Sequence, residues 1–267
     1  MSAADLWIDG VPATADDLAY PAMVNYGAYT SFGVQDGGVR GLDRHLTRLR
    51  EAGLELFGEA GDEDRARVWM RQAIGPRRDA WLRITLFAPE IGVRTPDWTG
   101  RPRMMIGVFP PATPLSSQPL RLQPQPYARE SAHLKHVATF GLIRARRVAR
   151  AAGFDDALFV GPDGRISEAS VSNIGFLSGD RVIWPQAPML AGVSQALVTD
   201  NLATSGLTSE TRPVTLADLD AFDGAFITNS ATPACAVAAI GDRPFATSPE
   251  RMAALASAWA AAPLQVI

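Results

Sequence analysis

The stretch ESAHLKHVATFG, residues 130–141, contains Lys135, the only lysine in the chain. Lysine and arginine together number 25, so arginine supplies every other cationic side chain of this class. Codon bias alone can produce such a composition, and a single lysine can then persist by drift. The alternative is that position 135 performs chemistry that a guanidinium cannot. An amine with an intrinsic pKa of about 10.4 becomes a nucleophile when its pKa is lowered, whereas arginine stays protonated. Schiff-base formation therefore requires lysine here.

The overall composition is that of a globular protein acting on small molecules. The 267 residues are enough for two domains, and 47% of them are hydrophobic and 20% charged. A formal net charge of −3 gives no general attraction to nucleic acid or to an anionic membrane. The first ten residues lack a signal-peptide pattern, and no run of about 18 apolar residues occurs. We therefore expect a cytoplasmic protein with neither a nucleic-acid nor a membrane partner.

Cysteine and histidine are too scarce for the common metal sites. Cys235 is the only cysteine, which excludes an internal disulfide and a cysteine-rich zinc site. The three histidines have no spacing typical of metal ligands. We expect Cys235 to fill core volume and no metal to bind.

The pattern of the N-terminal part of the chain predicts a mixture of short strands and amphipathic helices. Asp43 precedes a helix that carries Leu46, Leu49 and Leu54, and it is a plausible N-cap for that helix. A second helix is expected in DEDRARVWMRQAI, residues 62–74. Strands are expected in LWIDG (6–10), AYTSFGV (28–34), AWLRITLFA (80–88) and RMMIGVFP (103–110).

A proline-rich segment separates this part from the rest. Residues 110–126 contain six prolines, a composition that suits an extended connector and cannot sustain a helix. This predicts an N-terminal α+β domain over 1–109, a linker over 110–126 and a larger α/β domain over 127–267. Beyond the linker, helices are expected near 140–153, 192–206 and 248–262, with strands near 156–160, 171–185 and 224–231.

Four motifs around Lys135 occur in a fixed order. They are HLKHVATF (133–140), RISEASVSNIGF (165–176), GVSQALV (192–198) and FITNSAT (226–232). With them the sequence resembles the fold-type IV pyridoxal-phosphate enzymes, which include branched-chain and D-amino-acid aminotransferases, R-selective amine transaminases and aminodeoxychorismate lyase. The resemblance extends from LWIDG to the C-terminal third. It implies an α/β (α+β) two-domain fold of the D-amino-acid aminotransferase type and pyridoxal 5'-phosphate as cofactor. It also implies a homodimer with the cofactor pocket at the junction of the two domains.

The resemblance assigns the central chemistry to two residues. Lys135 matches the lysine that forms the internal aldimine and then carries a proton between the substrate carbon and the cofactor. Glu168 matches the glutamate that faces the pyridine nitrogen, where a carboxylate keeps the ring protonated and able to accept electrons. The alternative for Glu168 is a solvated residue at the end of a strand.

Further cofactor contacts are also implied by the resemblance. Those to the phosphate fall on an arginine, on the start of a helix and on a polar loop, because a phosphate needs a cation and backbone donors. The alternatives are a helix-surface residue for Arg48, simple helix capping for Ser194 and a turn residue for Asn173. The residues concerned, including an asparagine that lines the cofactor pocket, are Arg48, Asn173, Val193, Ser194, Asn229 and Ser230.

The substrate side departs from the family pattern. Phe140 stands where branched-chain enzymes have a tyrosine, and the expected pocket strand shows Ser31 or Phe32 in place of an acidic residue or a threonine. A substrate carboxylate calls for arginine, and either Arg83 or Arg94 matches a family position for it. Both could also be surface charges.

These features predict an aminotransferase that moves an amino group from an amino acid or amine to a keto acid in two half-reactions. The LKH sequence around Lys135 resembles the lyase, so a lyase that releases pyruvate is the alternative. A third hypothesis is a homologue that binds the cofactor without turnover.

Overall fold

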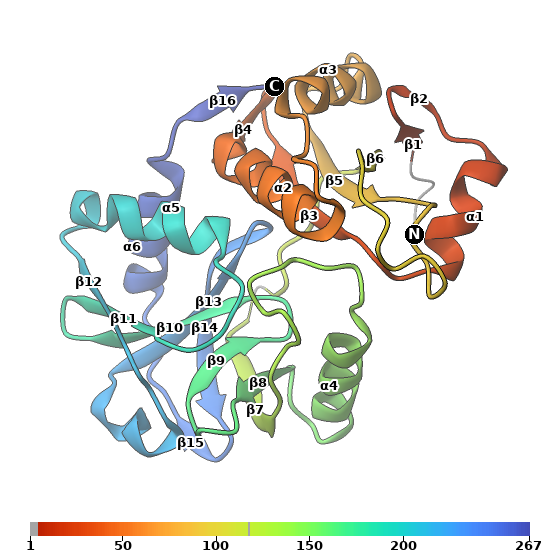
Figure 1. Ribbon diagram of the computed structural model, residues 1–267. Helices are drawn as coiled ribbons and strands as arrows, with labels where there is room; N and C mark the ends of the chain where they lie inside the picture. The colour runs from red at the N-terminus through yellow and green to blue at the C-terminus, as the bar shows by residue number, and fades with distance from the viewer. Residues whose placement is uncertain (1–4, 117) are drawn as a thin grey trace. The chain divides into compact units, whose positions relative to one another are not determined.

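The computed structural model describes residues 5–116 and 118–267 (Figure 1). Residues 1–4 and 117, which the predicted N-terminal domain and linker include, lie outside this range. The chain divides into two compact units. Unit 1 comprises Met1–Thr113, Leu134–Ala138 and Leu264–Ile267, and unit 2 comprises Pro114–His133 and Thr139–Pro263. Lys135 therefore belongs to the unit built from the N-terminal part of the chain, whereas the sequence placed it in the C-terminal domain.

Unit 1 contains a five-stranded antiparallel sheet in the order β2-β1-β6-β5-β3. Helix α2 packs on β3, and α3 packs on β6 and β1. Strand β16 pairs with β4, and α1 lies between β2 and β3 in the chain. The bounds are β1 Asp5–Ile8, β2 Val11–Pro12, α1 Ala15–Met23, β3 Ala28–Val34, β4 Gly38–Arg40, α2 Leu42–Phe57, α3 Glu63–Ile74, β5 Ala80–Phe87, β6 Arg103–Phe109 and β16 Leu264–Val266.

Alternation along β3 explains which of its side chains enter the core. Ala28, Thr30, Phe32 and Val34 are buried, and the residues between them are more exposed. Successive side chains of a strand point to opposite faces, so the core packs on one face of β3. Tyr29 lies on the other face.

The predicted N-cap of α2 was wrong by two residues. The helix begins at Leu42, and its N-cap is Gly41, whose φ of 69° places it in the left-handed region. Glycine adopts that conformation without steric cost, which allows the chain to turn directly from β4 into the helix. Asp43 lies in the first turn instead and pairs with Arg67 at 2.9 Å.

Unit 2 contains a sheet of nine strands in the order β12-β11-β10-β13-β14-β7-β8-β9, with β15 on β14. Strand β9 also pairs with β10 through Glu168 and Asn173, so six strands close into a ring. Two residues predicted for the cofactor site therefore face each other where the sheet closes. The bounds are β7 Leu120–Pro126, β8 Asp156–Val160, β9 Ile166–Ala169, β10 Asn173–Ser178, β11 Arg181–Pro185, β12 Thr208–Arg212, β13 Gly224–Asn229, β14 Thr232–Ile240 and β15 Arg243–Pro244.

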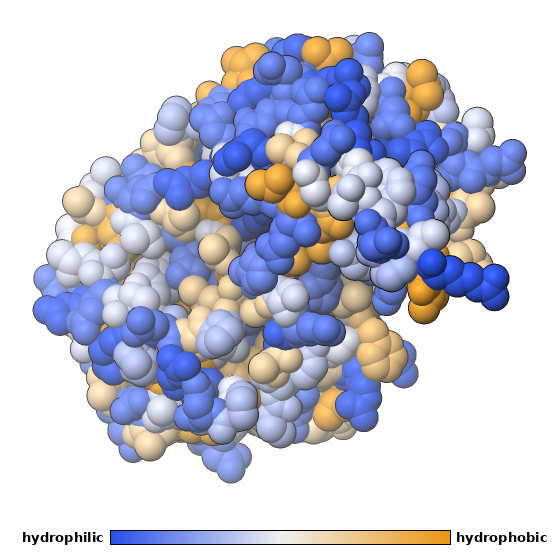
Figure 2. Space-filling view, viewed as in Figure 1, coloured by the Kyte–Doolittle hydropathy of each residue, from blue (hydrophilic) through white to orange (hydrophobic). Residues whose placement is uncertain are grey.

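Three α-helices surround this sheet. Helix α4 (Phe140–Ala151) packs on β8 and β7, whereas α5 (Val193–Asn201) and α6 (Pro249–Ala260) pack on each other. Two 3₁₀ helices, Leu202–Ser205 and Leu216–Ala221, complete the unit. Hydrophilic and hydrophobic side chains are interspersed on the face in Figure 2. Within the described residues, no helix has the length and apolar character needed to span a membrane.

The predicted linker over 110–126 is only partly an extended connector. Its last seven residues form β7, which pairs in parallel with β14 and β8. The pairing with β14 ends at Leu122, before Pro124 and Pro126, and from there β7 pairs with β8 alone. Proline has no N–H, and a strand tolerates it where one edge has no partner strand. The two prolines therefore lie in the part of β7 that has a partner strand on one side only.

Candidate active site

Lys135 lies on a short extended segment that pairs with the edge strand β3. The backbone amide of Tyr29 donates to the Lys135 carbonyl at 2.8 Å, and the amide of Val137 donates to the Gly27 carbonyl at 2.9 Å. An isolated bridge joins Ala28 to His136. Two backbone hydrogen bonds on either side of the bridge fix the direction in which the lysine side chain leaves the chain.

The Lys135 amine and the Arg83 guanidinium share one aromatic neighbour. Lys135 Nζ is 4.8 Å from the centroid of the Tyr29 ring, and Arg83 Cζ is 3.7 Å from the same centroid. On β5, Thr85 pairs with Tyr29 and Arg83 pairs with Ser31, so Arg83 lies diagonally from Tyr29 on the same face. Burial lowers the pKa of Arg83 below its ordinary value, although a guanidinium remains charged at neutral pH.

A buried histidine lies beneath this face, one helical turn before Arg48. His45 Nδ1 is 2.6 Å from Thr30 Oγ1, and the His45 ring packs on Phe32 at 4.7 Å between centroids. Burial, followed by the charges of Arg48 and Lys135, holds the pKa of His45 well below its usual value. His45 is therefore neutral at physiological pH, and its hydrogen bond joins α2, which carries Arg48, to β3.

The remaining substrate predictions fall outside this group. Phe32 is 2% exposed and belongs to the core of unit 1, so the side chain that β3 presents toward Lys135 is Tyr29. Arg94 is exposed on the loop between β5 and β6. Phe140, the first residue of α4, is 77% exposed. Of the four residues predicted to contact substrate, only Arg83 is placed beside a neighbour of the lysine amine.

Glu168 is a buried carboxylate on β9 of unit 2. Its Oε1 pairs with Arg129 Nη1 at 3.4 Å, and both side chains are at most 7% exposed. Its Oε2 accepts a hydrogen bond from the backbone amide of Leu190 at 3.4 Å. Arg129 Nη1 also donates to the Ala132 carbonyl at 3.3 Å. A carboxylate at this depth requires a counter-charge, and Arg129 supplies it.

Asn173 holds the loop that leads into α5. Its Nδ2 donates to the Leu190 carbonyl at 2.8 Å, so the side chains of Asn173 and Glu168 both hydrogen-bond to the backbone of Leu190. A Cβ built on Gly192 would lie 1.9 Å from Asn173 Oδ1. Glycine is therefore the only residue that permits this close approach of the loop to β10.

The first turn of α5 presents backbone donors. Its first helical hydrogen bond runs from the Ala196 amide to the Gly192 carbonyl, so the amides of Val193, Ser194 and Gln195 precede the helical hydrogen bonding. Gly192, the N-cap, has no side chain to satisfy them. These amides lie at the N-terminus of the helix, which is the positive end of the helix dipole, and such an arrangement suits an anion. Val193 and Ser194 are themselves buried.

Asn229 is engaged within the protein. Its Nδ2 donates to Ser172 Oγ at 2.9 Å, and its Oδ1 accepts from the amides of Ala231 and Thr232, each at 2.9 Å. Asn229 therefore joins the turn after β13 to the turn that follows Glu168. Ser230, at intermediate exposure, is the next residue on the same turn.

Two residues of this arrangement were missed by the sequence interpretation. Tyr29 could have been found from the alternation of β3, since the pattern buries Thr30 and Phe32 and leaves Tyr29 on the opposite face. Arg129 had no signal beyond lying six residues before Lys135. Its pairing with Glu168 depends on the fold of unit 2 rather than on any local pattern.

Residues 27–240 match the family model described as amino-transferase class IV. The chain belongs to the class IV aminotransferase family. That segment includes all the site residues predicted from the family resemblance, from Ser31 to Ser230. The curated proteins contain no sequence that matches this chain.

Several solved aminotransferase structures have the same fold as this chain. A branched-chain aminotransferase from Thermoproteus uzoniensis, solved with norvaline, has 20% sequence identity and a TM-score of 0.81, with 96% of this chain and 94% of that chain covered. A hypothetical aminotransferase from Mycobacterium tuberculosis, in a PLP-bound form, has 21% identity and a TM-score of 0.79 over 97% and 98%. The fold IV-transaminase CpuTA1 from Curtobacterium pusillum has 24% identity and a TM-score of 0.73 over 87% and 83%. At these identities the similarity establishes the mixed helix and sheet fold.

Proposed function

We propose that this class IV aminotransferase uses pyridoxal 5'-phosphate to transfer an amino group between an amino acid or amine and a keto acid, with Lys135 as the covalent anchor of the cofactor. The observation that carries the proposal is the placement of the only lysine amine, held by the edge of β3 and 4.8 Å from the Tyr29 ring. When bound, the cofactor supplies an aldehyde that reacts with amines and a ring that accepts negative charge from the substrate carbon.

The residues of unit 2 fit the polar groups of such a cofactor. The amides of Val193 and Ser194 suit its phosphate, and no side chain caps that helix start. In the same turn, the buried Oε1 of Gln195 has no hydrogen-bond partner among the described residues. This oxygen accepts hydrogen bonds, so it would bind a donor such as a hydroxyl and not a phosphate oxygen, and the fit to the phosphate rests on the amides. Arg48 provides the cation that the proposal assigns to the phosphate.

Glu168 is the residue that we assign to the pyridine nitrogen. Arg129 pairs with its carboxylate and the Leu190 amide donates to it, and the two contacts fix its orientation. An ionised carboxylate beside that nitrogen holds a proton on it, and the ring then accepts electrons more readily. Asn173 acts through the backbone of Leu190 and is therefore a positioning residue.

Lys135 and Arg83 are the residues that we assign to the substrate side. The Lys135 amine would serve as the general base that takes a proton from the substrate α-carbon and, once protonated, as the general acid. The Arg83 guanidinium binds a substrate carboxylate, because its planar fork matches two carboxylate oxygens and its stacking on Tyr29 fixes its position. Arg94, exposed on its loop, is the alternative for this role.

A lyase reaction that releases pyruvate is the second candidate. The observation that favours it is the LKH sequence at residues 134–136, although Ala138 stands where the lyase group has an asparagine. The proposal also includes a homodimer located in the cytoplasm. Light scattering of the purified protein measures the oligomeric state.

A donor and acceptor panel tests the proposal. Purified protein is expected to be yellow and to lose that absorbance when alanine, leucine, glutamate or 1-phenylethylamine is added alone. A lyase instead releases pyruvate from aminodeoxychorismate without a keto acceptor. The Lys135→Ala variant is expected to keep its circular dichroism spectrum and lose turnover. A holoprotein spectrum that no donor changes, together with no release of pyruvate from aminodeoxychorismate, would leave only a homologue that binds the cofactor without turnover.

A further inference from the structure

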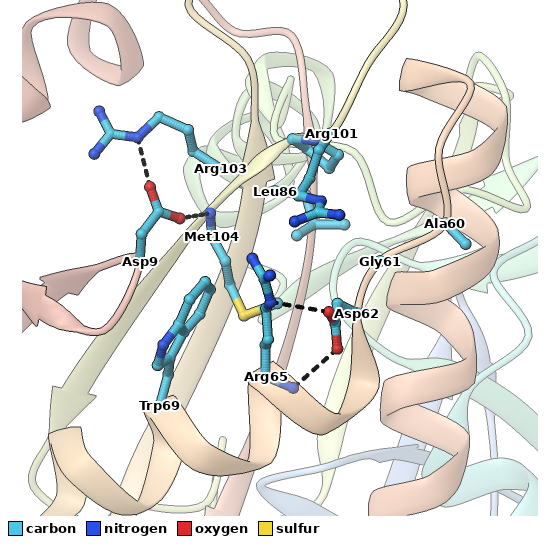
Figure 3. A pocket seen from close by; sticks show the side chains of 11 residues that line it. Asp9, Ala60, Gly61, Asp62, Arg65, Trp69, Leu86, Arg101, Arg103 and Met104 are labelled. Atoms are coloured by element: carbon cyan, nitrogen blue, oxygen red, sulfur yellow. Dashed lines mark hydrogen bonds and ion pairs between the residues drawn. The ribbon is translucent and has the colours of Figure 1, made fainter.

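Unit 1 contains a cavity that lies apart from the residues around Lys135. It has a volume of about 420 Å³, and its lining excludes Tyr29, Arg48, Arg83 and Lys135. Small-molecule sites range from about 300 to 1,000 Å³, so the cavity can hold a small organic molecule. Its lining residues come from the turn after β1, the loop before α3, α3 itself, β5 and the start of β6. They are Asp9, Ala60, Gly61, Asp62, Arg65, Trp69, Leu86, Arg101, Pro102, Arg103 and Met104 (Figure 3).

Apolar side chains form one wall of the cavity. Leu86 and Met104 are buried in the core of unit 1, and Trp69 packs against that core. The Trp69 ring also lies against the turn at Gly10, where a Cβ would come within 2.4 Å of it. This contact fixes the indole, so the wall is a preformed surface for an apolar group.

Both carboxylates in the lining are already engaged. Asp9 accepts from Arg103 Nε at 2.7 Å and from the Met104 amide at 2.9 Å. Asp62 caps α3 by accepting from the Arg65 amide at 3.0 Å, and it pairs with Arg65 Nε at 3.1 Å. Arg103 makes a second ion pair, to Asp17 at 3.0 Å. These two aspartates and Arg103 therefore form fixed internal pairs.

Two guanidinium groups retain donors for a ligand. Arg65 uses Nε for Asp62, and its terminal nitrogens make no hydrogen bond to any described residue. Arg101 is 3.9 Å from Glu59, which is beyond hydrogen-bond distance, and it makes no hydrogen bond within the described part of the chain. Figure 3 shows the Arg65 side chain rising from α3 toward Leu86, where the Arg101 guanidinium also lies.

We infer that this cavity binds a small monocarboxylate with an apolar body. The guanidinium groups of Arg65 and Arg101 bind the carboxylate, and the wall formed by Trp69, Met104 and Leu86 binds the apolar body. The three arginines of the lining lie near its two aspartates, and Asp17 and Glu59 lie against Arg103 and Arg101 from outside the lining. These four carboxylates leave no excess of positive charge for a polyphosphate, so a ligand with a single negative charge is favoured. The inference is independent of the proposed function.

Calorimetric titration of the holoprotein with three probes tests the inference. The probes are 3-phenylpropionate, the uncharged 3-phenylpropanol and inorganic phosphate. The variants are Arg101→Gln, the double variant Arg65→Gln/Arg101→Gln and the control Arg78→Gln, which removes a surface arginine that is 71% exposed and paired with Asp36. Any binding of a carboxylate elsewhere on the protein is the same in all variants. The difference between the isotherm of a cavity variant and that of the wild type therefore measures binding in this cavity.

We expect 3-phenylpropionate to bind saturably, the double variant to lose that component by at least tenfold, and Arg78→Gln to match the wild type. We expect Arg101→Gln to weaken the component by at least threefold without affecting folding, because Arg101 makes no hydrogen bond to lose. A crystal soaked with 3-phenylpropionate is expected to show the carboxylate between the two guanidinium groups. Identical isotherms for the double variant and the wild type would overturn the inference. Equal affinity for phosphate or for the alcohol would overturn the assignment of the ligand class.

Discussion

Replacing Gly192 by alanine tests the packing that places the start of α5. The new Cβ would lie 1.9 Å from Asn173 Oδ1, a separation that no relaxed structure permits. Either the Asn173 amide or the loop must move, and the 2.8 Å hydrogen bond from Asn173 to the Leu190 carbonyl is then lost. Losing a buried hydrogen bond costs about 1 kcal/mol, and forcing a methyl group into a packed site costs about 1–3 kcal/mol. We therefore expect the free energy of unfolding to fall by about 2–4 kcal/mol.

A double-mutant cycle separates the clash from a general effect of the substitution. Asn173→Ala alone loses the hydrogen bond but makes room for the new methyl group. The variant Gly192→Ala/Asn173→Ala is therefore expected to be about as stable as Asn173→Ala, with a coupling energy above about 1 kcal/mol. Gly92→Ala is the matched control, because the nearest neighbour of its Cβ among the described residues, Thr95 Oγ1, is 3.9 Å away. Urea unfolding of the apoprotein measures all four variants. Additive effects, or a Gly192→Ala protein within about 0.5 kcal/mol of wild type, would refute the reasoning.

Three further substitutions test other parts of the account. Thr30→Val removes the hydrogen bond to His45, and we expect urea unfolding to show a loss of about 1–2 kcal/mol. Arg129→Gln leaves the Glu168 carboxylate without its ion pair, so the free energy of unfolding at pH 7 is expected to fall by about 3–5 kcal/mol. Hydrogen bonds from Thr14 lower the pKa of Asp17 to about 2. A depressed pKa stabilises the folded state above the unfolded pKa of about 3.9, and this contribution is lost as the pH falls. The stability difference between wild type and Asp17→Asn is therefore expected to shrink between about pH 4 and pH 2.

Matched controls exist for the first two substitutions. Thr228→Val removes a buried hydroxyl that has no partner among the described residues, so it is expected to be neutral or stabilising. A loss equal to that of Thr30→Val would show that the His45 contact contributes nothing specific. Arg181→Gln breaks an exposed pair with Glu210 and is expected to cost under about 1 kcal/mol. An equal cost for Arg129→Gln would contradict the burial argument. A pH-independent difference for Asp17→Asn would contradict the third prediction.

The sequence predicted the regular elements wherever periodicity and turn residues agreed. The alternation of AYTSFGV predicted β3, and the amphipathic pattern of DEDRARVWMRQAI predicted α3. The failures lie where tertiary pairing overrides local composition. Strand β7 tolerates its prolines only because the pairing with β14 stops at Leu122, and no local pattern contains that information.

The same division applies to the candidate site. Lys135 and Glu168 were predicted as site residues because each lies in a recognisable motif. The contact of Tyr29 with Lys135 and Arg83 depends on the pairing of residues 135–137 with residues 27–29, which are more than 100 positions earlier. Asn229 was identified as a cofactor contact from its motif, whereas the structure engages its side chain in two turns. Motifs therefore locate the residues, and long-range pairing decides what each side chain contacts.

The central claim is that Lys135 holds the cofactor covalently. Borohydride reduction of freshly purified holoprotein, followed by tryptic peptide mapping, tests it most directly. Reduction is expected to fix a pyridoxyl phosphate group on Lys135. Because trypsin does not cleave after a modified lysine, the peptide ESAHLKHVATFGLIR, residues 130–144, is expected to appear uncleaved with the added mass. Recovery of that segment unlabelled and cleaved after Lys135, from protein that retains its yellow colour before reduction, would contradict the claim.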